Sequence, residues 1–438
     1  MYIRNYYPNN MTEKYPKFTV IIPQKDRAEY LYHTLRTCLI QDYPNCEFIV
    51  ADDCSDDNSK DVVNDLSKKD ARIRLLSHDH HVGMRVNFED ALSEVKSGYV
   101  MALGGDDGLV PGCIQRMYEI IKETGTPLLT WKTPGFIYSG YESEQSLLSV
   151  RREKFKGYKF VKSEDFLNRI SQSLYYLVDE CPMFYVKGVA SIDLVNRVKE
   201  RTPDHSFYYC PTPDGFSGVV LAGEVEEFVY TNEPLSINGG TSKSQGLAYK
   251  KTDQASRKAA SQFFDDNARK TMHSELASQP YSPLIPLMTA DYLLTAKDLP
   301  GWPGKFKLFS FEHLIDKTFK SLETSTFSNE VLGRELLILK NIAIQHGLED
   351  YFESKLKKTK RRIINKNMID GFFITSNVFD FNAKELCINN IYDAALATPF
   401  AYRLCNKVSM HEFLKFIKRN VRVTFKMLNR KVERLPKV

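Results

Sequence analysis

Two pairs of adjacent aspartates are the residues best suited to chemistry. Asp52 and Asp53 follow the apolar run EFIVA, whereas Asp106 and Asp107 follow YVMAL and are flanked by glycines. A carboxylate of the first pair can accept hydrogen bonds from a base or a ribose hydroxyl. Two neighbouring carboxylates repel each other unless a cation lies beside them, and Mg²⁺ or Mn²⁺ is commonly held by one or two carboxylates plus substrate phosphates. Both pairs also suit ordinary turns and helix caps.

Other candidate residues follow later in the chain. Arg85 stands before a predicted helix and could pair with a phosphate, or remain a surface cation. Asp214, in the stretch PTPDGFSG, could be a general base or a turn residue. The cluster of His78, His80 and His81 could hold a metal, although loop histidines are more often solvated.

The pattern around these residues predicts an α/β fold. Apolar, strand-like runs cover residues 18–22, 47–51, 73–76 and 99–103, and helical patterns cover residues 28–41 and 84–96. Such alternation is typical of βαβ units and a mostly parallel central sheet. Because ligands bind at the carboxyl ends of strands in open α/β sheets, both aspartate pairs are expected at the ligand edge.

The remaining chain divides by pattern. Residues 127–246 are mixed, rich in aromatics and interrupted by proline and glycine, whereas residues after 250 show mostly helical periodicity. We therefore expect an N-terminal extension (1–17) and a catalytic α/β domain (18–248). Its nucleotide-binding half is 18–126 and its acceptor-binding half is 127–248. A mainly α-helical domain (249–438) with a basic tail (411–438) follows.

Composition limits the class of protein without naming a function. The 438 residues are 42% hydrophobic and 26% charged, as in soluble globular proteins. Eight cysteines occur without a CxxC pair, which favours a reducing cytoplasm. No apolar run approaches the roughly 18 residues of a membrane span. The tail carries nine Lys/Arg against two Asp/Glu and has an amphipathic helical pattern, so it could lie on an anionic membrane or pack on the domain. We expect a cytoplasmic protein and no nucleic-acid partner, with contact between the tail and the inner face of the cell membrane as one of the two alternatives.

Several sequence blocks together resemble the family 2 glycosyltransferases. VIIPQKDR is similar to the family's VIIPTYNR, and QDYPNCEFIVADDCSDDN is similar to its QTYPNFEIIVVDDGSTD. The resemblance covers residues 18–246. It implies a GT-A fold, which is a Rossmann-like nucleotide-sugar-binding domain with a DxD-type metal loop. It also implies an inverting transfer from a nucleoside-diphosphate sugar, with UDP as the expected nucleotide, to a glycan or lipid-linked acceptor in bacterial surface-polysaccharide assembly.

Carried over by position, the resemblance implies roles for individual residues. It places the donor at the loops after the first, second and fourth strands: Pro23, Gln24, Asp26, Asp52 or Asp53, Arg85 and Asp106. Asp106 and Asp107 would hold Mn²⁺ or Mg²⁺, and Asp214 would be the catalytic base. Residues 234–240 resemble the segment that closes the family's active site.

Three departures from the family pattern bear on these roles. Gly104 replaces the first aspartate of LDxDD, so metal binding rests on Asp106 and Asp107. Gln24, Lys25 and Asp26 replace Thr-Tyr-Asn, and Asp214 lacks the ED doublet.

Other classes of protein fit the sequence less well. A sugar nucleotidyltransferase would need a glycine-rich phosphate loop after the first strand, where PQKDRAEY has no glycine. A degenerate nucleotide-sugar-binding or scaffold protein is the non-enzymatic alternative, and Gly104 motivates it. A nicotinamide dehydrogenase is disfavoured because no GxGxxG follows the first strand.

Overall fold

The structure is a computed structural model. It describes residues 15–140, 146–152, 157–210, 212–244, 269, 271–325, 327–364, 373–375, 378–407 and 430–434.

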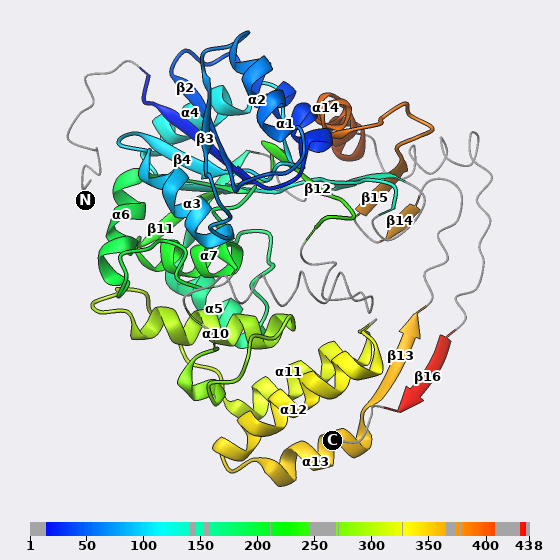
Figure 1. Cartoon of the computed structure of the whole chain (residues 1–438). Coiled ribbons are helices and arrows are strands. Elements are labelled where there is room, and N and C mark those ends of the chain that lie inside the picture. Colours follow the sequence, from blue (N-terminus) through cyan, green and yellow to red (C-terminus); the bar gives the residue numbers. More distant parts are fainter. Residues whose placement is uncertain are drawn as a thin grey trace.

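An eight-stranded mixed sheet forms the centre of the first half of the chain (Figure 1). Its order is β3-β2-β1-β4-β10-β6-β11-β9. The four predicted strands are confirmed as a parallel unit: β1 (Phe18–Gln24), β2 (Cys46–Asp52), β3 (Ile73–Ser77) and β4 (Tyr99–Ala102). β1 continues two residues beyond the predicted end, and its last residue, Gln24, is in register with Asp52.

The alternation of side chains along β1 separates two cores. Val20 and Ile22 point to the face covered by α1 (Ala28–Leu39), α2 (Ser59–Ser67) and α4 (Cys113–Thr124). Ile21 points to the opposite face, which α3 (Met84–Ser93) covers. Because both faces are covered, β1, β2 and β4 are mostly apolar, and this is why they could be recognised from the sequence.

The second half of the sheet mixes strand directions. β10 (Gly188–Ser191) lies antiparallel between β4 and β6 (Leu128–Trp131), and β11 (Glu227–Thr231) and β9 (Tyr158–Lys162) complete the edge. The helices of this half are α5 (Ser163–Ser173), α6 (Ile192–Arg201) and α7 (Pro213–Gly223).

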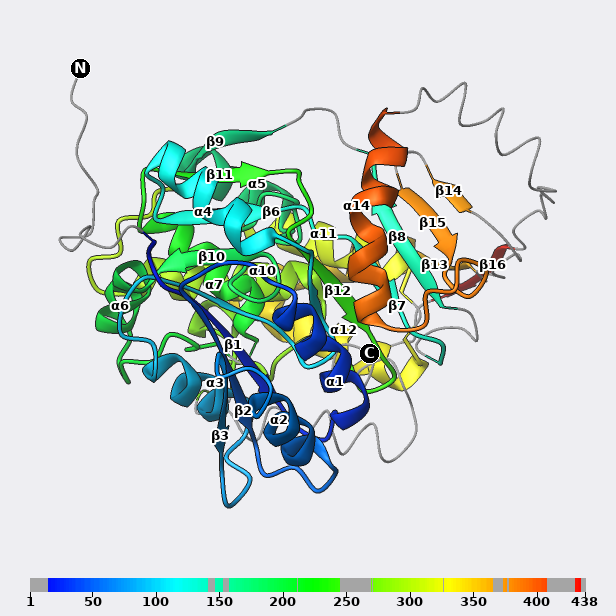
Figure 2. The same cartoon turned by 90° about the horizontal axis from the view of Figure 1, so that it is seen from above.

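A second sheet brings distant segments together beside α1. Its order is β14-β15-β8-β7-β12-β5. The bounds are Phe373–Thr375, Val378–Asn382, Leu147–Arg151, Gly135–Ile137, Ser236–Gly240 and Gly108–Leu109, respectively. Helix α14 (Ile391–Lys407) packs against α1 and against this sheet (Figure 2). A segment from the predicted C-terminal domain thus lies on the α/β domain, while the boundary at residue 248 stays a prediction.

The predicted helical region is confirmed. It consists of η1 (Ser274–Leu276), α10 (Ile285–Asp298), α11 (Phe311–Glu323), α12 (Asn329–Gln345) and α13 (Glu349–Lys358). Helix α10 is buried almost all round because it lies between α5 and α7 on one side and α11 on the other. The helical region and the sheet therefore share one hydrophobic core.

Most of the predicted basic tail lies outside the described residues. The described part, β16 (Arg430–Arg434), is a strand antiparallel to β13 (Lys360–Ile364), so the predicted helix is wrong over these five residues. Among the helices that the structure describes, none is long and apolar enough to cross a membrane.

Candidate active site

The two aspartate pairs lie at the carboxyl edge of the parallel strands, as predicted. Asp52 ends β2, and Asp106 lies in the loop between β4 and β5. Gln24, at the end of β1, hydrogen-bonds Asp52 and lies close to the second pair's loop, since a β-carbon on Gly105 would be 3.2 Å from its Cβ. All four aspartates are buried, with at most 5% of each residue exposed.

Asp52 belongs to a side-chain network with the loop after β1. Gln24 donates through Nε2 to Asp52 Oδ1, and its Oε1 accepts from Ser59 Oγ at 3.2 Å. The other oxygen of Asp52 accepts the Ser55 N–H at 3.0 Å, with Lys60 Nζ at 3.7 Å. The glutamine that replaces the family's threonine is thus fixed directly against the first aspartate.

The neighbouring Asp26 has its own tie to this loop. Its φ is 52°, and its carboxylate accepts the Asp56 N–H at 2.8 Å.

Asp53 ties down the loop that precedes α3. Its carboxylate accepts the backbone N–H of Val82 at 2.7 Å and of Gly83 at 3.2 Å. His81 Nδ1 lies 2.8 Å from the same carboxylate. The interpretation of the histidines as a metal cluster finds no support, because no group of three or more metal-ligating side chains occurs among the residues that were searched, which are the described ones.

Asp107 is also held by backbone N–H groups. Its Oδ2 accepts from Gly104 at 2.8 Å, and its Oδ1 accepts from Gly239, in β12, at 2.7 Å. Burial, followed by the negative charge of Asp106, raises the pKa of Asp107. Gly239 is required here, since a β-carbon would lie 1.8 Å from the Asp106 carbonyl oxygen.

The absence of a side chain at residue 104 has a steric explanation. A β-carbon at this position would lie 2.2 Å from the Tyr185 hydroxyl and 2.5 Å from Asp107 Oδ2, far inside contact distance. Burial, then Asp107 and Asp106, raise the pKa of Tyr185, which keeps its hydroxyl protonated beside the aspartates. The space that the first LDxDD aspartate would need is therefore filled by a tyrosine from another part of the chain.

Asp106 is bound by side chains. Its Oδ2 accepts from Arg27 Nη1 at 2.7 Å and from Thr241 Oγ1 at 2.9 Å. No described residue donates a hydrogen bond to Oδ1, which faces Gly104. Asp106 can therefore ligate a divalent cation through Oδ1, and diphosphate oxygens can supply further ligands. Both oxygens of Asp107, in contrast, already accept a backbone N–H.

Arg85 lies in the first turn of α3, within the predicted helical stretch 84–96. It pairs with Asp204 at 3.0 Å, and its Nε is buried without a hydrogen-bond partner among the described residues.

Asp214 lies in the first turn of α7, directly after Pro213, which suits an acidic residue and a proline. The carboxyl group is closely surrounded, and burial raises its pKa to about 6. Its charge acts on the hydroxyls of Tyr176, Tyr185 and Tyr208. Since Tyr185 also feels Asp106 and Asp107, this tyrosine connects the predicted base with the metal loop.

Comparison with known proteins shows the family of the first part of the chain. Residues 19–177 match the family described as glycosyl transferase family 2. The chain carries a family 2 glycosyltransferase domain. The predicted α/β class, a GT-A domain followed by helices, is confirmed with it.

The glycosyltransferase domain is similar to enzymes of bacterial glycan assembly. It is 32% identical over 109 residues to the GalNAc(5)-diNAcBac-PP-undecaprenol beta-1,3-glucosyltransferase of Campylobacter jejuni, covering 25% of this chain and 35% of that protein. It is also 32% identical over 89 residues to the UDP-Glc:alpha-D-GlcNAc-diphosphoundecaprenol beta-1,3-glucosyltransferase WfaP of Escherichia coli, covering 20% and 35%. The matches thus span about a third of these relatives.

Among solved structures, TarS 1-349 of S. aureus in complex with UDP covers 82% of this chain and 94% of its own. The sequence identity is 16% and the TM-score 0.44, too low to support an argument about function.

Three residues at the site of the glycosyltransferase domain were not predicted. Arg27 stood in the quoted block VIIPQKDR, so its motif was visible although its contact, 79 residues away, was not. Tyr185 and Tyr208 carry no local signal. The hydroxyl of Tyr208 is buried and has no hydrogen-bond partner in the described part of the chain.

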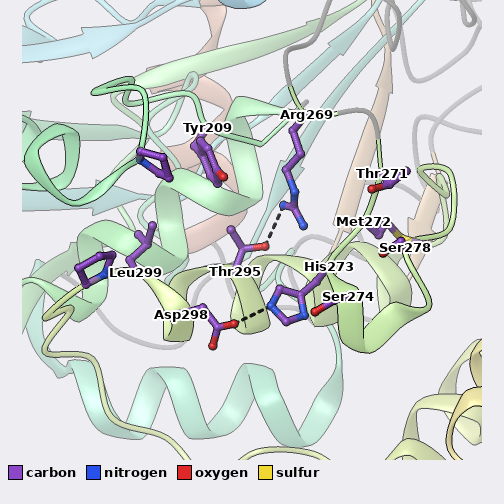
Figure 3. Close-up of a pocket in the computed structure, with 12 residues that line it drawn as sticks. Tyr209, Arg269, Thr271, Met272, His273, Ser274, Ser278, Thr295, Asp298 and Leu299 are labelled. Carbon is purple, nitrogen blue, oxygen red and sulfur yellow. Dashed lines mark hydrogen bonds and ion pairs between the residues drawn. The ribbon is translucent and has the colours of Figure 1, made fainter.

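A separate cavity of about 330 Å³ lies where α10 meets the connection between α6 and α7 (Figure 3). Arg269 donates to Thr295 at 2.8 Å, and His273 pairs with Asp298 at 2.8 Å. Tyr209 lines it from the side of the glycosyltransferase domain. None of the predicted site residues lines this cavity.

Proposed function

We propose that this protein transfers a glycosyl unit from a nucleoside-diphosphate sugar, with UDP as the expected nucleotide, to a hydroxyl of a glycan or lipid-linked acceptor. The observation that carries the proposal is the position of Asp52 and Asp106 at the ligand edge of a family 2 domain, with Asp214 near enough to act on Tyr185, which Asp106 also affects. The acceptor class is supported by relatives whose names specify undecaprenol-linked glycans.

The donor would lie across the loops after β1, β2 and β4. Pro23, Gln24, Asp26 and Asp52 would contact the base and ribose. Gln24 and Asp52 hydrogen-bond each other, and this amide and carboxylate can exchange that bond for bonds to the nucleotide. Asp53 would support this surface by holding the loop before α3, and Arg85, whose Nε is buried without a hydrogen-bond partner among the described residues, would lie near the donor. This extends the family-based assignment by separating contact from support.

Asp106 is the residue that would hold Mn²⁺ or Mg²⁺, through Oδ1. A bound divalent cation would neutralise charge that develops on the departing diphosphate. Asp107 would orient the loop that carries Asp106, since its two backbone hydrogen bonds join β12 to Gly104.

Transfer would be a single displacement with inversion. Asp214 accepts the proton of the acceptor hydroxyl while its oxygen forms a bond to the anomeric carbon. The bond from that carbon to the diphosphate oxygen breaks, and the electron pair leaves with the nucleoside diphosphate. A carboxyl with a pKa of about 6 is mostly ionised at neutral pH and is still basic enough to accept the proton.

The test is the release of nucleoside diphosphate from a panel of nucleotide sugars, with and without Mn²⁺. Asp214→Asn removes the base, and Asp193→Asn is the matched control because Asp193 is also an acidic residue in the first turn of a helix, α6. Release from one donor that is lost only in Asp214→Asn supports the proposal. Release of monophosphate would instead indicate a nucleotidyltransferase, and donor binding without release by any variant would indicate a degenerate binding protein.

A further inference from the structure

Arg27 places a buried positive charge at the proposed diphosphate site. It is the residue before α1, and its backbone N–H donates to Ser59 Oγ at 3.3 Å. Its side chain is 17% exposed. One guanidinium nitrogen lies 2.7 Å from Asp106 Oδ2 and the other donates to the Lys243 carbonyl at 3.1 Å. The guanidinium is therefore held at one end by Asp106 and at the other by the backbone of Lys243.

The surroundings keep this arginine charged. Burial opposes the positive charge, but Asp106, Tyr185 and Asp107 outweigh that effect, so that the pKa of Arg27 is raised. A guanidinium stays protonated throughout the physiological pH range, so a diphosphate entering this site would meet a permanent cation beside Asp106.

Gly105 lies between Arg27 and Gln24. A β-carbon on Gly105 would come within 3.2 Å of Arg27 Cδ and 3.2 Å of Gln24 Cβ. The bare backbone at this glycine thus runs between the residue proposed to contact the base and the arginine. A nucleotide bound along that line would bring its phosphates to Arg27.

We propose that Arg27 binds the diphosphate of the donor directly and supplies its main positive charge, so that nucleotide binding does not require a divalent cation. This inference rests on the proposed function. A guanidinium suits the role because it donates two parallel hydrogen bonds to phosphate oxygens and cannot lose its proton. Asp106 holds the group in position before the donor arrives.

Two residues that follow β12 also bond at this site. Thr241 donates to Asp106, and Lys243 donates to the Asp26 carbonyl oxygen, so residues that follow β12 cover Arg27. Lys243 is a second cation at the same edge.

The alternative is that Arg27 only compensates Asp106 within the fold. The two roles differ in one double variant. If Arg27 is only a counter-ion, Arg27→Ala with Asp106→Asn removes both charges and restores nucleotide binding. If Arg27 contacts the diphosphate, the double variant binds as weakly as Arg27→Ala.

The experiment is isothermal titration calorimetry of UDP, GDP, dTDP and ADP with the full chain, in EDTA and then in Mn²⁺. We expect wild-type protein to bind one nucleotide in EDTA, with less than about a tenfold gain from Mn²⁺. In EDTA, Arg27→Ala should lower nucleotide affinity about tenfold or more. Arg27→Lys should lower it less, because lysine keeps the positive charge but cannot donate two parallel hydrogen bonds. Arg74→Ala, which removes an exposed cation paired with Glu94, should change nothing.

Each result has a separate meaning. Binding that requires Mn²⁺, or a double variant restored to wild-type affinity, overturns the role of Arg27 and leaves the proposed function standing. Absence of nucleotide binding under both conditions contradicts the proposed function itself. Thermal unfolding of each variant shows whether it is folded. If Arg27→Ala is unfolded, the nucleotide affinity of Arg27→Lys is compared with that of wild type instead.

Discussion

The two aspartate pairs look alike in the sequence, but the members of each pair bond differently. Asp53 and Asp107, the second members, each accept two backbone N–H groups. Asp52 and Asp106, the first members, each bond to a side chain of the loop that begins at the end of β1. The same order holds in two loops that are 54 residues apart in numbering, from Asp52 to Asp106.

This difference separates support from ligand binding. A carboxylate that turns away from two backbone N–H groups leaves them unpaired in a buried place, at about 1–3 kcal/mol each. A carboxylate that bonds to an amide or a guanidinium can exchange that partner for a ligand that satisfies both. We therefore assign ligand contact to Asp52 and Asp106, and loop support to Asp53 and Asp107.

Asp214 belongs to neither pair, and we expect its removal to affect only the chemical step. Asp214→Asn should lower kcat by about 10²- to 10⁴-fold, the usual range for loss of a general base, while nucleotide affinity and the unfolding temperature stay near wild type. Steady-state kinetics with the donor that the nucleotide-sugar panel selects measures this. A variant with normal kcat would remove Asp214 from the mechanism.

Removal of a supporting carboxylate should act on stability. Asp107→Ala leaves the N–H groups of Gly104 and Gly239 without an acceptor, so we expect a loss of about 2–4 kcal/mol in the free energy of unfolding. Urea denaturation followed by fluorescence measures it, with Asp106→Ala as the matched variant. Equal losses in the two variants would erase the distinction between the members of this pair.

Restoration of the family aspartate tests why Gly104 is a glycine. Gly104→Asp should destabilise the chain by about 1–3 kcal/mol, because its β-carbon would meet the Tyr185 hydroxyl. Tyr185→Phe in the same chain should recover part of this loss. Thermal unfolding of the single and double variants decides, and a Gly104→Asp protein as stable as wild type would exclude the steric explanation.

The smallest expected effect is on the pH profile. Since the pKa of Asp214 is raised to about 6 and the ionised form is the base, kcat/KM should fall about tenfold per pH unit below 6 and be level above it. A profile measured from about pH 4.5 to 8 tests this. A level profile through pH 6 would show that another group accepts the proton.

The first half of the sheet could be predicted because its central buried strands are mostly apolar and the helices between them show clear periodicity. The second sheet could not, since its strands are two to five residues long and come from segments as distant as β5 and β15. A bridge between residues more than 200 positions apart has no local pattern.

At the site, the sequence located the loops but not the partners within them. Asp106 and Asp107 were predicted as equivalent ligands because their spacing is all that a sequence shows. The backbone N–H of Gly239 and the guanidinium of Arg27, which distinguish them, become visible only when β12 and the loop after β1 are brought to the same edge.

The most direct measurement is the nucleotide affinity of four matched variants, Asp52→Asn, Asp53→Asn, Asp106→Asn and Asp107→Asn, each checked for folding. Our account predicts that the substitutions of Asp52 and Asp106 weaken nucleotide binding at nearly wild-type stability, and that those of Asp53 and Asp107 lower stability while the folded fraction binds normally. Equal binding losses in all four folded variants, or losses confined to Asp53 and Asp107, would contradict it.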